Sequence, residues 1–241
     1  STRKESSAAS DVYKRQLLRR ALLVSLIANG HLLLESVPGL AKTLAASTLA
    51  ASLEADFARI QCTPDLLPSD IVGTEVYNPA TSTFSTELGP VHANFVLLDE
   101  INRSSAKTQS AMLEAMQERQ VTIGGTTYPL PDPFIVLATQ NPIDEEGTYV
   151  LPHAQMDRFL LKEVITYPEP GDELEVLRRR RAGQLDSVRD RAPVATLDEV
   201  RHLQSLLTRV HVDESVLRYI VEVVQACLLY TSDAADDSLR V

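Results

Sequence analysis

The chain lacks the residues and runs that mark several protein classes. Its 241 residues include two cysteines, Cys62 and Cys227, which provide neither a disulfide framework nor a metal-binding pair. The five histidines show no ligand spacing such as H-E-x-x-H. No apolar run approaches the ~20 residues that span a bilayer, and no signal peptide is visible. We therefore expect no membrane span and a reducing, cytoplasmic location.

Positive charge is also scarce relative to negative charge. The formal net charge is −10, which argues against a protein that holds duplex nucleic acid by bulk charge. Hydrophobic residues make up 44% of the chain, enough for the core of one large domain or two small ones. The sequence shows no internal repeat.

Glycine is missing where one motif would ordinarily contain it. An apolar run, His31–Glu35, leads into a short loop, a Lys-Thr pair and a helix-forming run, Leu44–Leu53. This is the layout of a phosphate-binding loop, in which backbone N–H groups surround a phosphate at a helix N-terminus. The candidate phosphate-binding residues are Ser36, Val37, Pro38, Gly39, Leu40, Ala41, Lys42 and Thr43.

The loop matches the pattern G-x-x-x-x-G-K-[ST] incompletely. In that pattern Lys42 reaches the outer phosphates and the Thr43 hydroxyl binds Mg²⁺. Ser36 and Ala41 stand where the two glycines are expected, and only Gly39 remains inside the loop. A serine at the first position is unfavourable if the backbone there needs a positive φ. The alternative is an ordinary strand, turn and helix with a solvated lysine.

Two acids end a later apolar strand. The run Phe95–Leu98 is followed directly by Asp99 and Glu100. In open α/β sheets, ligands bind at the carboxyl ends of the strands. Behind a phosphate-binding loop, the first acid holds Mg²⁺ and the second accepts a proton from the attacking water. We predict that Asp99, with Thr43, binds magnesium and that Glu100 is the general base; a solvated strand end is the alternative.

An amide and an arginine complete the candidate site. Asn141 follows the apolar strand Phe134–Thr139, where its amide can hydrogen-bond both a γ-phosphate and the attacking water, unless Gln-Asn-Pro is only a turn. Arg158 is a candidate arginine finger for a neighbouring subunit's phosphate. A local pairing with Asp157 is the alternative. Further candidates for the arginine role are Arg103 and Arg119.

Strand and helix patterns alternate through the first part of the chain. Predicted strands cover residues 31–35, 57–61, 94–98, 134–139 and 160–166, and predicted helices cover residues 17–28, 42–53 and 106–118. Hairpins are predicted at 75–85 and 121–130, the second because Gly124-Gly125 supply positive φ. Apolar strands need cover on both faces, so we predict a three-layer α-β-α nucleotide-binding core with a parallel sheet over residues 17–167.

Only helices are expected after the proline-rich boundary Tyr167–Gly171. They are predicted at 172–182, 196–210 and 213–226, the second starting with the capping box Thr196–Glu199. We expect residues 168–226 to form part of a helical lid domain. Residues 1–16 and 227–241 are predicted to be non-native extensions. Asp11–Gln16 and Cys227–Ser232 can be back-translated into reverse complements apart from one nucleotide, as a translated sequencing adapter would be.

Several blocks together resemble the MoxR family of AAA+ ATPases. They are Ser36–Thr43, Thr63–Asp70, Leu98–Arg103, Leu113–Arg119, Ala138–Pro142 and Asp157–Phe159. The resemblance runs from about Ile27 to Thr166 and more loosely to Ala226. The family usually has alanine at position 41 but glycine at position 36, so Ser36 is a departure.

The resemblance implies an ATPase that works as a hexameric ring with nucleotide between subunits. It assigns Lys42 and Thr43 to phosphate and Mg²⁺, Asp99 to Mg²⁺, Glu100 to the base, Asn141 to the first sensor and Arg158 to the trans finger. It also implies a chaperone-like remodeller of protein clients, which works with a von Willebrand factor A domain partner and assists maturation or metal-cofactor insertion. The segment 65–91 resembles an insertion that places a loop toward the ring pore.

Two other functions remain open from the sequence. The chain could be a nucleotide-gated assembly scaffold with little turnover, because Ser36 departs from the loop pattern and the second-sensor arginine is expected beyond Ala226. It could also be a chelatase or nucleic-acid motor subunit on the same core. The acidic balance and the absence of interleaved basic and aromatic residues weigh against nucleic acid.

Overall fold

The computed structural model describes two compact units, residues 1–204 and 205–241. The residues that it describes are 17–36, 42–141, 149, 151–165, 171, 174, 178, 181 and 192–237, with backbone alone for 228–237. The predicted domain boundary near residue 167 falls outside them and remains a prediction, as do the non-native extensions.

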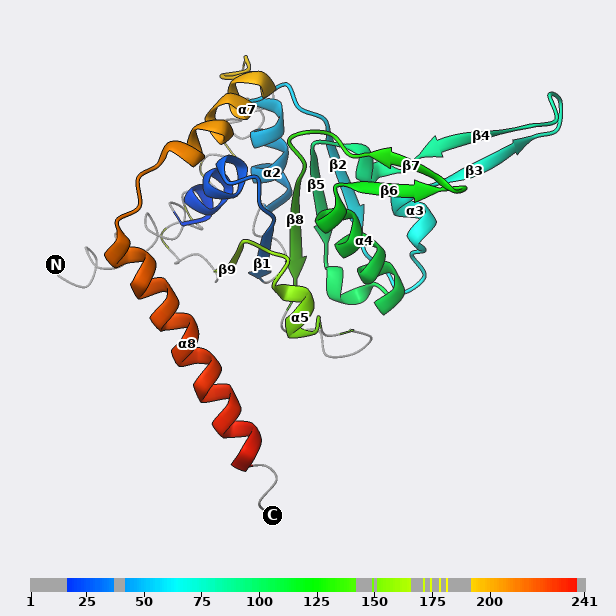
Figure 1. Ribbon diagram of the computed structural model, residues 1–241. Helices are drawn as coiled ribbons and strands as arrows, with labels where there is room; N and C mark the ends of the chain where they lie inside the picture. The colour runs from blue at the N-terminus through cyan, green and yellow to red at the C-terminus, as the bar shows by residue number, and fades with distance from the viewer. Residues whose placement is uncertain are drawn as a thin grey trace. The chain divides into compact units, whose positions relative to one another are not determined.

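The first unit is built on a five-stranded parallel sheet (Figure 1). Its strands, in spatial order, are β2 (Phe57–Gln61), β5 (Phe95–Asp99), β8 (Ile135–Gln140), β1 (Leu32–Ser36) and β9 (Leu161–Ile165). All neighbouring pairs are parallel, which confirms the predicted parallel sheet. In this spatial order β1 lies inside the sheet between β8 and β9, and β5 lies on the other side of β8.

Alternate residues of the central strands enter two apolar clusters on opposite faces of the sheet. Leu33, Val96 and Val136 pack on one face with Met112 and Leu113 of α4 (Ala106–Glu118). The intervening strand residues pack on the other face with a helix over residues 17–27, with α2 (Lys42–Ala51) and with α7 (Leu197–Leu206). Both faces of the sheet are thus covered, which confirms the predicted three-layer architecture.

Local sequence signals set the helix and hairpin boundaries. Ser105 caps α4 by accepting a hydrogen bond from the Thr108 N–H at 3.3 Å. Gly124 and Gly125, at φ 57° and 84°, form the turn between β6 (Gln120–Ile123) and β7 (Thr126–Pro129). A second hairpin pairs β3 (Gly73–Asn78) with β4 (Thr83–Leu88). Short helical segments lie between these elements: α3 (Pro68–Val72), η1 (Pro90–His92), η2 (Ile101–Arg103) and α5 (His153–Met156).

The C-terminal part is helical where it is described. The Thr196 capping box forms as predicted, since Glu199 Oε2 accepts from the Thr196 N–H at 2.8 Å. The helix α7 ends sooner than expected, in the 3₁₀ turn η4 (Leu207–Arg209), and α8 spans Glu214–Asp237. It continues beyond Ala226 because the residues that follow contain neither glycine nor proline. Most of the helix predicted at 172–182 lies outside the described residues.

A partly buried polar cluster joins the end of α4 to the residues that precede β1 and β8. The Arg119 guanidinium, at the C-terminal end of α4, donates to the backbone oxygens of Phe134 and Asn29. It also lies 5.7 Å from the centre of the Phe134 ring. These contacts give Arg119 a structural role within its own subunit, in place of the trans role considered for it. His31 joins the same cluster, with its ring 5.7 Å from that of Phe134.

No helix in the described part of the chain is long and apolar enough to cross a membrane.

Candidate nucleotide site

The candidate residues meet at one edge of the sheet. Strands β1, β5 and β8 are parallel, so their carboxyl ends lie on the same side. β1 ends at Ser36 shortly before the Lys42-Thr43 pair that opens α2, β5 ends at Asp99, and β8 is followed by Asn141. The tertiary structure thereby brings together three motifs that are about 40 residues or more apart in the sequence.

The electrostatics of Lys42 show that its amine lies near the two acids. Partial burial lowers the pKa of Lys42, while the negative charges of Asp99 and Glu100 act in the opposite direction. An amine at the N-terminal end of α2, near two carboxylates at the end of β5, is an arrangement suited to a phosphate with a divalent cation. Lys42 and Glu100 therefore lie near each other, as a shared phosphate site requires.

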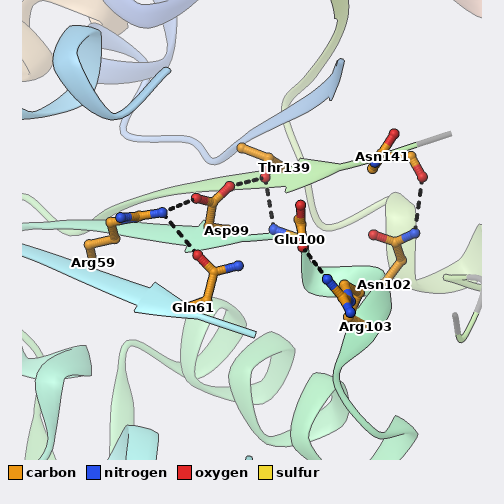
Figure 2. Close-up of polar contacts among 8 residues, drawn as sticks. All are labelled: Arg59, Gln61, Asp99, Glu100, Asn102, Arg103, Thr139 and Asn141. Carbon is orange, nitrogen blue, oxygen red and sulfur yellow. Dashed lines mark hydrogen bonds and ion pairs between the residues drawn. The ribbon is translucent and has the colours of Figure 1, made fainter. Parts of the chain in front are cut away.

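A buried threonine joins the two acids (Figure 2). Thr139, fully buried in β8, donates its hydroxyl hydrogen to Asp99 Oδ1 at 2.9 Å. The Thr139 hydroxyl oxygen in turn accepts a hydrogen bond from the Glu100 backbone N–H at 2.8 Å. Since one hydroxyl both donates and accepts, it fixes the Asp99 carboxylate and the Glu100 backbone relative to each other.

Glu100 lies in a backbone conformation that non-glycine residues rarely adopt. Its φ and ψ are 60° and 54°, in the left-handed region. Such a conformation costs on the order of 1–2 kcal/mol and is found disproportionately at functional sites. The Glu100 carboxylate also forms an ion pair with Arg103, with Nη1 and Oε2 at 3.1 Å. The left-handed backbone at Glu100 therefore turns the chain away from the direction of β5. The ion pair with Arg103 holds the Glu100 carboxylate at the edge of the sheet.

The backbone at Ser36 does not need the missing glycine. Ser36 is the last residue of β1, paired with Ile165 of β9, and it is not among the described residues with positive φ. Its side chain is 2% exposed, and its hydroxyl has no hydrogen-bond partner among the described residues. The predicted loop residues Val37, Pro38, Gly39, Leu40 and Ala41 lie outside the described residues.

Asn141 lies at the same edge as the acids, and Arg158 contacts α4 and α5. Asn141 is 6% exposed, and its backbone oxygen accepts from the Asn102 side chain at 3.3 Å. Arg158 is exposed, and its Nε donates to Gln117 Oε1 of α4 at 3.0 Å. Its Nη1 donates to the Ala154 backbone oxygen at 3.3 Å. The trans role of Arg158 remains a prediction.

The donor set at the edge fits magnesium bound with a nucleotide. Thr43 and Asp99 offer a hydroxyl and a carboxylate, the hard oxygen ligands that Mg²⁺ uses when it is bound largely through phosphates and water. No group of three or more His, Cys, Asp or Glu residues in the described part of the chain is placed to hold a metal ion alone.

Two polar residues of the site were missed by the sequence reasoning, Thr139 and Arg59. The Arg59 side chain, on β2, donates to Asp99 Oδ2 at 2.6 Å and to Gln61 Oε1 at 2.9 Å. The sequence does contain a signal that could have identified Thr139. This residue is the polar end of an otherwise apolar predicted strand, and it lies two residues before Asn141. Arg59 has no such local signal, because its partner lies 40 residues away on the neighbouring strand.

Replacing Thr139 with valine is expected to destabilise the fold by about 1–3 kcal/mol. Valine has nearly the same shape but leaves both Asp99 Oδ1 and the Glu100 N–H without this partner. Urea unfolding measures the change in the free energy of unfolding. Thr139→Ser, which keeps the hydroxyl, should recover most of the loss, and a neutral Thr139→Val variant would contradict the bridge.

Comparison with known proteins agrees with this geometry. The sequence profile of the family described as "ATPase family associated with various cellular activities (AAA)" matches residues 31–161, more than half of the chain. The chain is 49% identical over 211 residues to chaperone MoxR1 of Mycobacterium tuberculosis, covering 88% of this chain and 55% of that protein. It is 50% identical over 203 residues to protein YeaC of Bacillus subtilis, covering 84% and 63%.

A solved structure shares both sequence and fold. The crystal structure of a candidate ATPase from Cytophaga hutchinsonii superposes with a TM-score of 0.77 at 44% identity, covering 94% of this chain and 73% of that one. The chain spans 55% and 63% of the length of the two curated relatives above. The matched profile contains the Lys42-Thr43 pair, both acids and Asn141. The chain therefore belongs to the AAA family of ATPases, on its MoxR branch.

Proposed function

We propose that the protein binds ATP with Mg²⁺ at this sheet edge and hydrolyses it. The observation that carries the proposal is the meeting of Lys42, Asp99 and Glu100 at the carboxyl ends of parallel strands. Family membership supports the same activity. The residues of the loop, Ser36 to Thr43, would surround the phosphates, and Thr43 and Asp99 would hold the metal.

Each side chain has a distinct chemical task in this proposal. The Lys42 amine binds the outer phosphates, and the bound Mg²⁺ supplies charge stabilisation for the leaving phosphate group. The Glu100 carboxylate takes a proton from the attacking water, and Thr139 keeps Glu100 and Asp99 in register. Asn141 orients the water without adding charge. Because these groups are already placed, little reorganisation is needed for reaction.

The assembly and cellular role are also proposals. We infer a hexameric ring in which Arg158 reaches the nucleotide of a neighbouring subunit, supported by the exposed position of Arg158. The name of one relative, chaperone MoxR1, supports a chaperone-like remodeller of protein clients. A von Willebrand factor A domain partner, metal-cofactor maturation and a cytoplasmic location complete the proposal.

The proposal is tested first by ATP binding in calorimetry. The 241-residue chain should give saturable heat with ATP and Mg²⁺, and Lys42→Met should weaken binding at least tenfold because a phosphate loses its charged partner. Lys107→Met, which changes an exposed lysine of α4, is the matched control. Absence of binding by the unaltered chain would overturn the proposal. Binding without phosphate release would instead favour the nucleotide-gated scaffold.

A further inference from the structure

Arg59 is a positive charge placed directly against the acid assigned to magnesium. Asp99 of β5 is paired in register with Gln61 of β2, and Arg59 lies two residues before Gln61 on the same side of that strand. Its Nη2 is 2.6 Å from Asp99 Oδ2 and 2.9 Å from Gln61 Oε1 (Figure 2). The Arg59 side chain is 48% exposed and that of Asp99 is 15% exposed, so the ion pair lies at the surface of the site.

Both carboxylate oxygens of Asp99 already have partners within the chain. Oδ1 accepts from Thr139, and Oδ2 accepts from Arg59. The two contacts differ in kind, because the Thr139 hydroxyl is neutral whereas the Arg59 guanidinium is positively charged. A cation that approaches Asp99 therefore meets the Arg59 charge, whereas a polyphosphate that approaches the same edge is attracted by it.

We infer that Arg59 is a positioning residue that sets how strongly nucleotide binding depends on magnesium. It holds the Asp99 carboxylate in place before the metal arrives, lowers the affinity of the site for Mg²⁺ and raises the affinity for metal-free nucleotide. The inference rests on the proposed nucleotide site. Arg59, on β2, is an additional residue of that site. It is separate from the phosphate-binding loop, the two acids, Asn141 and Arg158.

The charge of Arg59 determines the direction in which each of the two affinities, for Mg²⁺ and for metal-free nucleotide, should change. Like charges repel, so removing the Arg59 charge removes a penalty on a divalent cation near Asp99. The same change removes an attraction for the triphosphate when no metal neutralises it. A purely structural role for Arg59 has a different signature, because a disordered Asp99 would weaken both binding events together. The two effects must therefore be measured separately.

The experiment uses the 241-residue chain and the fluorescent, slowly hydrolysed analogue mant-AMPPNP. Its dissociation constant is measured in EDTA and across a MgCl₂ titration, for the unaltered chain and for Arg59→Gln. We expect Arg59→Gln to lower the half-saturating Mg²⁺ concentration roughly three- to tenfold. We expect it also to weaken binding in EDTA by a similar factor. Raised ionic strength should shrink both changes.

Two further variants separate charge from shape. Arg59→Lys keeps the charge and should remain close to the unaltered chain in both measurements. Arg201→Gln removes another exposed arginine that pairs with an aspartate, Asp198, and should change neither measurement.

Every outcome decides the inference. A lower half-saturating Mg²⁺ concentration together with weaker binding in EDTA supports it. Any other combination, or no shift, overturns it and leaves the proposed function standing. If the unaltered chain binds no mant-AMPPNP in either condition, the proposed function fails and the inference fails with it.

Discussion

Replacing Glu100 with glutamine is expected to lower the rate of ATP hydrolysis roughly 10²- to 10⁴-fold while ATP still binds. Glutamine keeps the size and hydrogen-bonding reach of the side chain but does not accept a proton from water. The left-handed backbone at Glu100 and its N–H bond to Thr139 are independent of the side-chain carboxylate, so the local geometry should persist. Steady-state phosphate release, paired with calorimetry for binding, measures the effect.

The ion pair between Glu100 and Arg103 calls for a matched control. Glutamine at position 100 loses this pair as well as the base. Arg103→Gln loses only the pair, which is a partly exposed contact worth less than about 1 kcal/mol, so its rate should fall less than about tenfold. Glu114→Gln, at an exposed acid of α4, controls for the overall charge change. Equal rates for Glu100→Gln and the unaltered chain would remove Glu100 from the mechanism.

Acidification is expected to destabilise the fold through His31, by about 3 kcal/mol once the pH is below 4. The His31 Nε2 is within hydrogen-bond distance of the Met116 oxygen, and Nδ1 accepts from the Val136 N–H, both at 3.1 Å. Nδ1 can accept this hydrogen bond only when it carries no proton, so the imidazole ring is neutral in the folded protein. Burial, followed by the charge of Arg119, lowers the His31 pKa from 6.5 to about 4, against the effect of the Met116 carbonyl.

The sign of the pH effect follows from that shift. Because the folded-state pKa lies below the unfolded value, the unfolded chain binds the extra proton first as the pH falls. The stability contribution is complete above pH 6.5 and is lost between 6.5 and about 4. Urea unfolding at pH 7 and pH 5 should therefore show a His31-dependent loss of roughly 2 kcal/mol.

His31→Gln tests this assignment directly. The variant should be less stable at pH 7, because the ring contact with Phe134 is lost, but its stability should depend less on pH between 7 and 5. His153→Gln, at an exposed histidine, should keep the pH dependence of the unaltered chain. The same slope in His31→Gln as in the unaltered chain would refute the role of His31.

Much of the fold was predictable because its signals are local. The apolar runs that became β1, β5 and β8 are buried on both faces, and the glycine pair at 124–125 forms the turn that its permissive backbone predicts. The α4 limits were also predictable, since Ser105 is a strong capping residue. The end of α8 was predicted too early, at Ala226, because the residues after it were expected to be a non-native extension, whereas the helix continues to Asp237.

The sequence by itself determined which chemical groups are available: the lysine and hydroxyl at the start of α2, the two acids after β5 and the amide after β8. Only the tertiary structure decided which of them share a site and what holds them there. Thr139 and Arg59 contact Asp99 from strands that are neighbours in the sheet but 40 residues away in the chain. The Arg119 guanidinium, a candidate for the trans role from the sequence, instead binds backbone oxygens within its own fold. The physical reason is common to all three residues: a side chain's type follows from the sequence, whereas its partners follow from strand order and register, which depend on how the whole core packs.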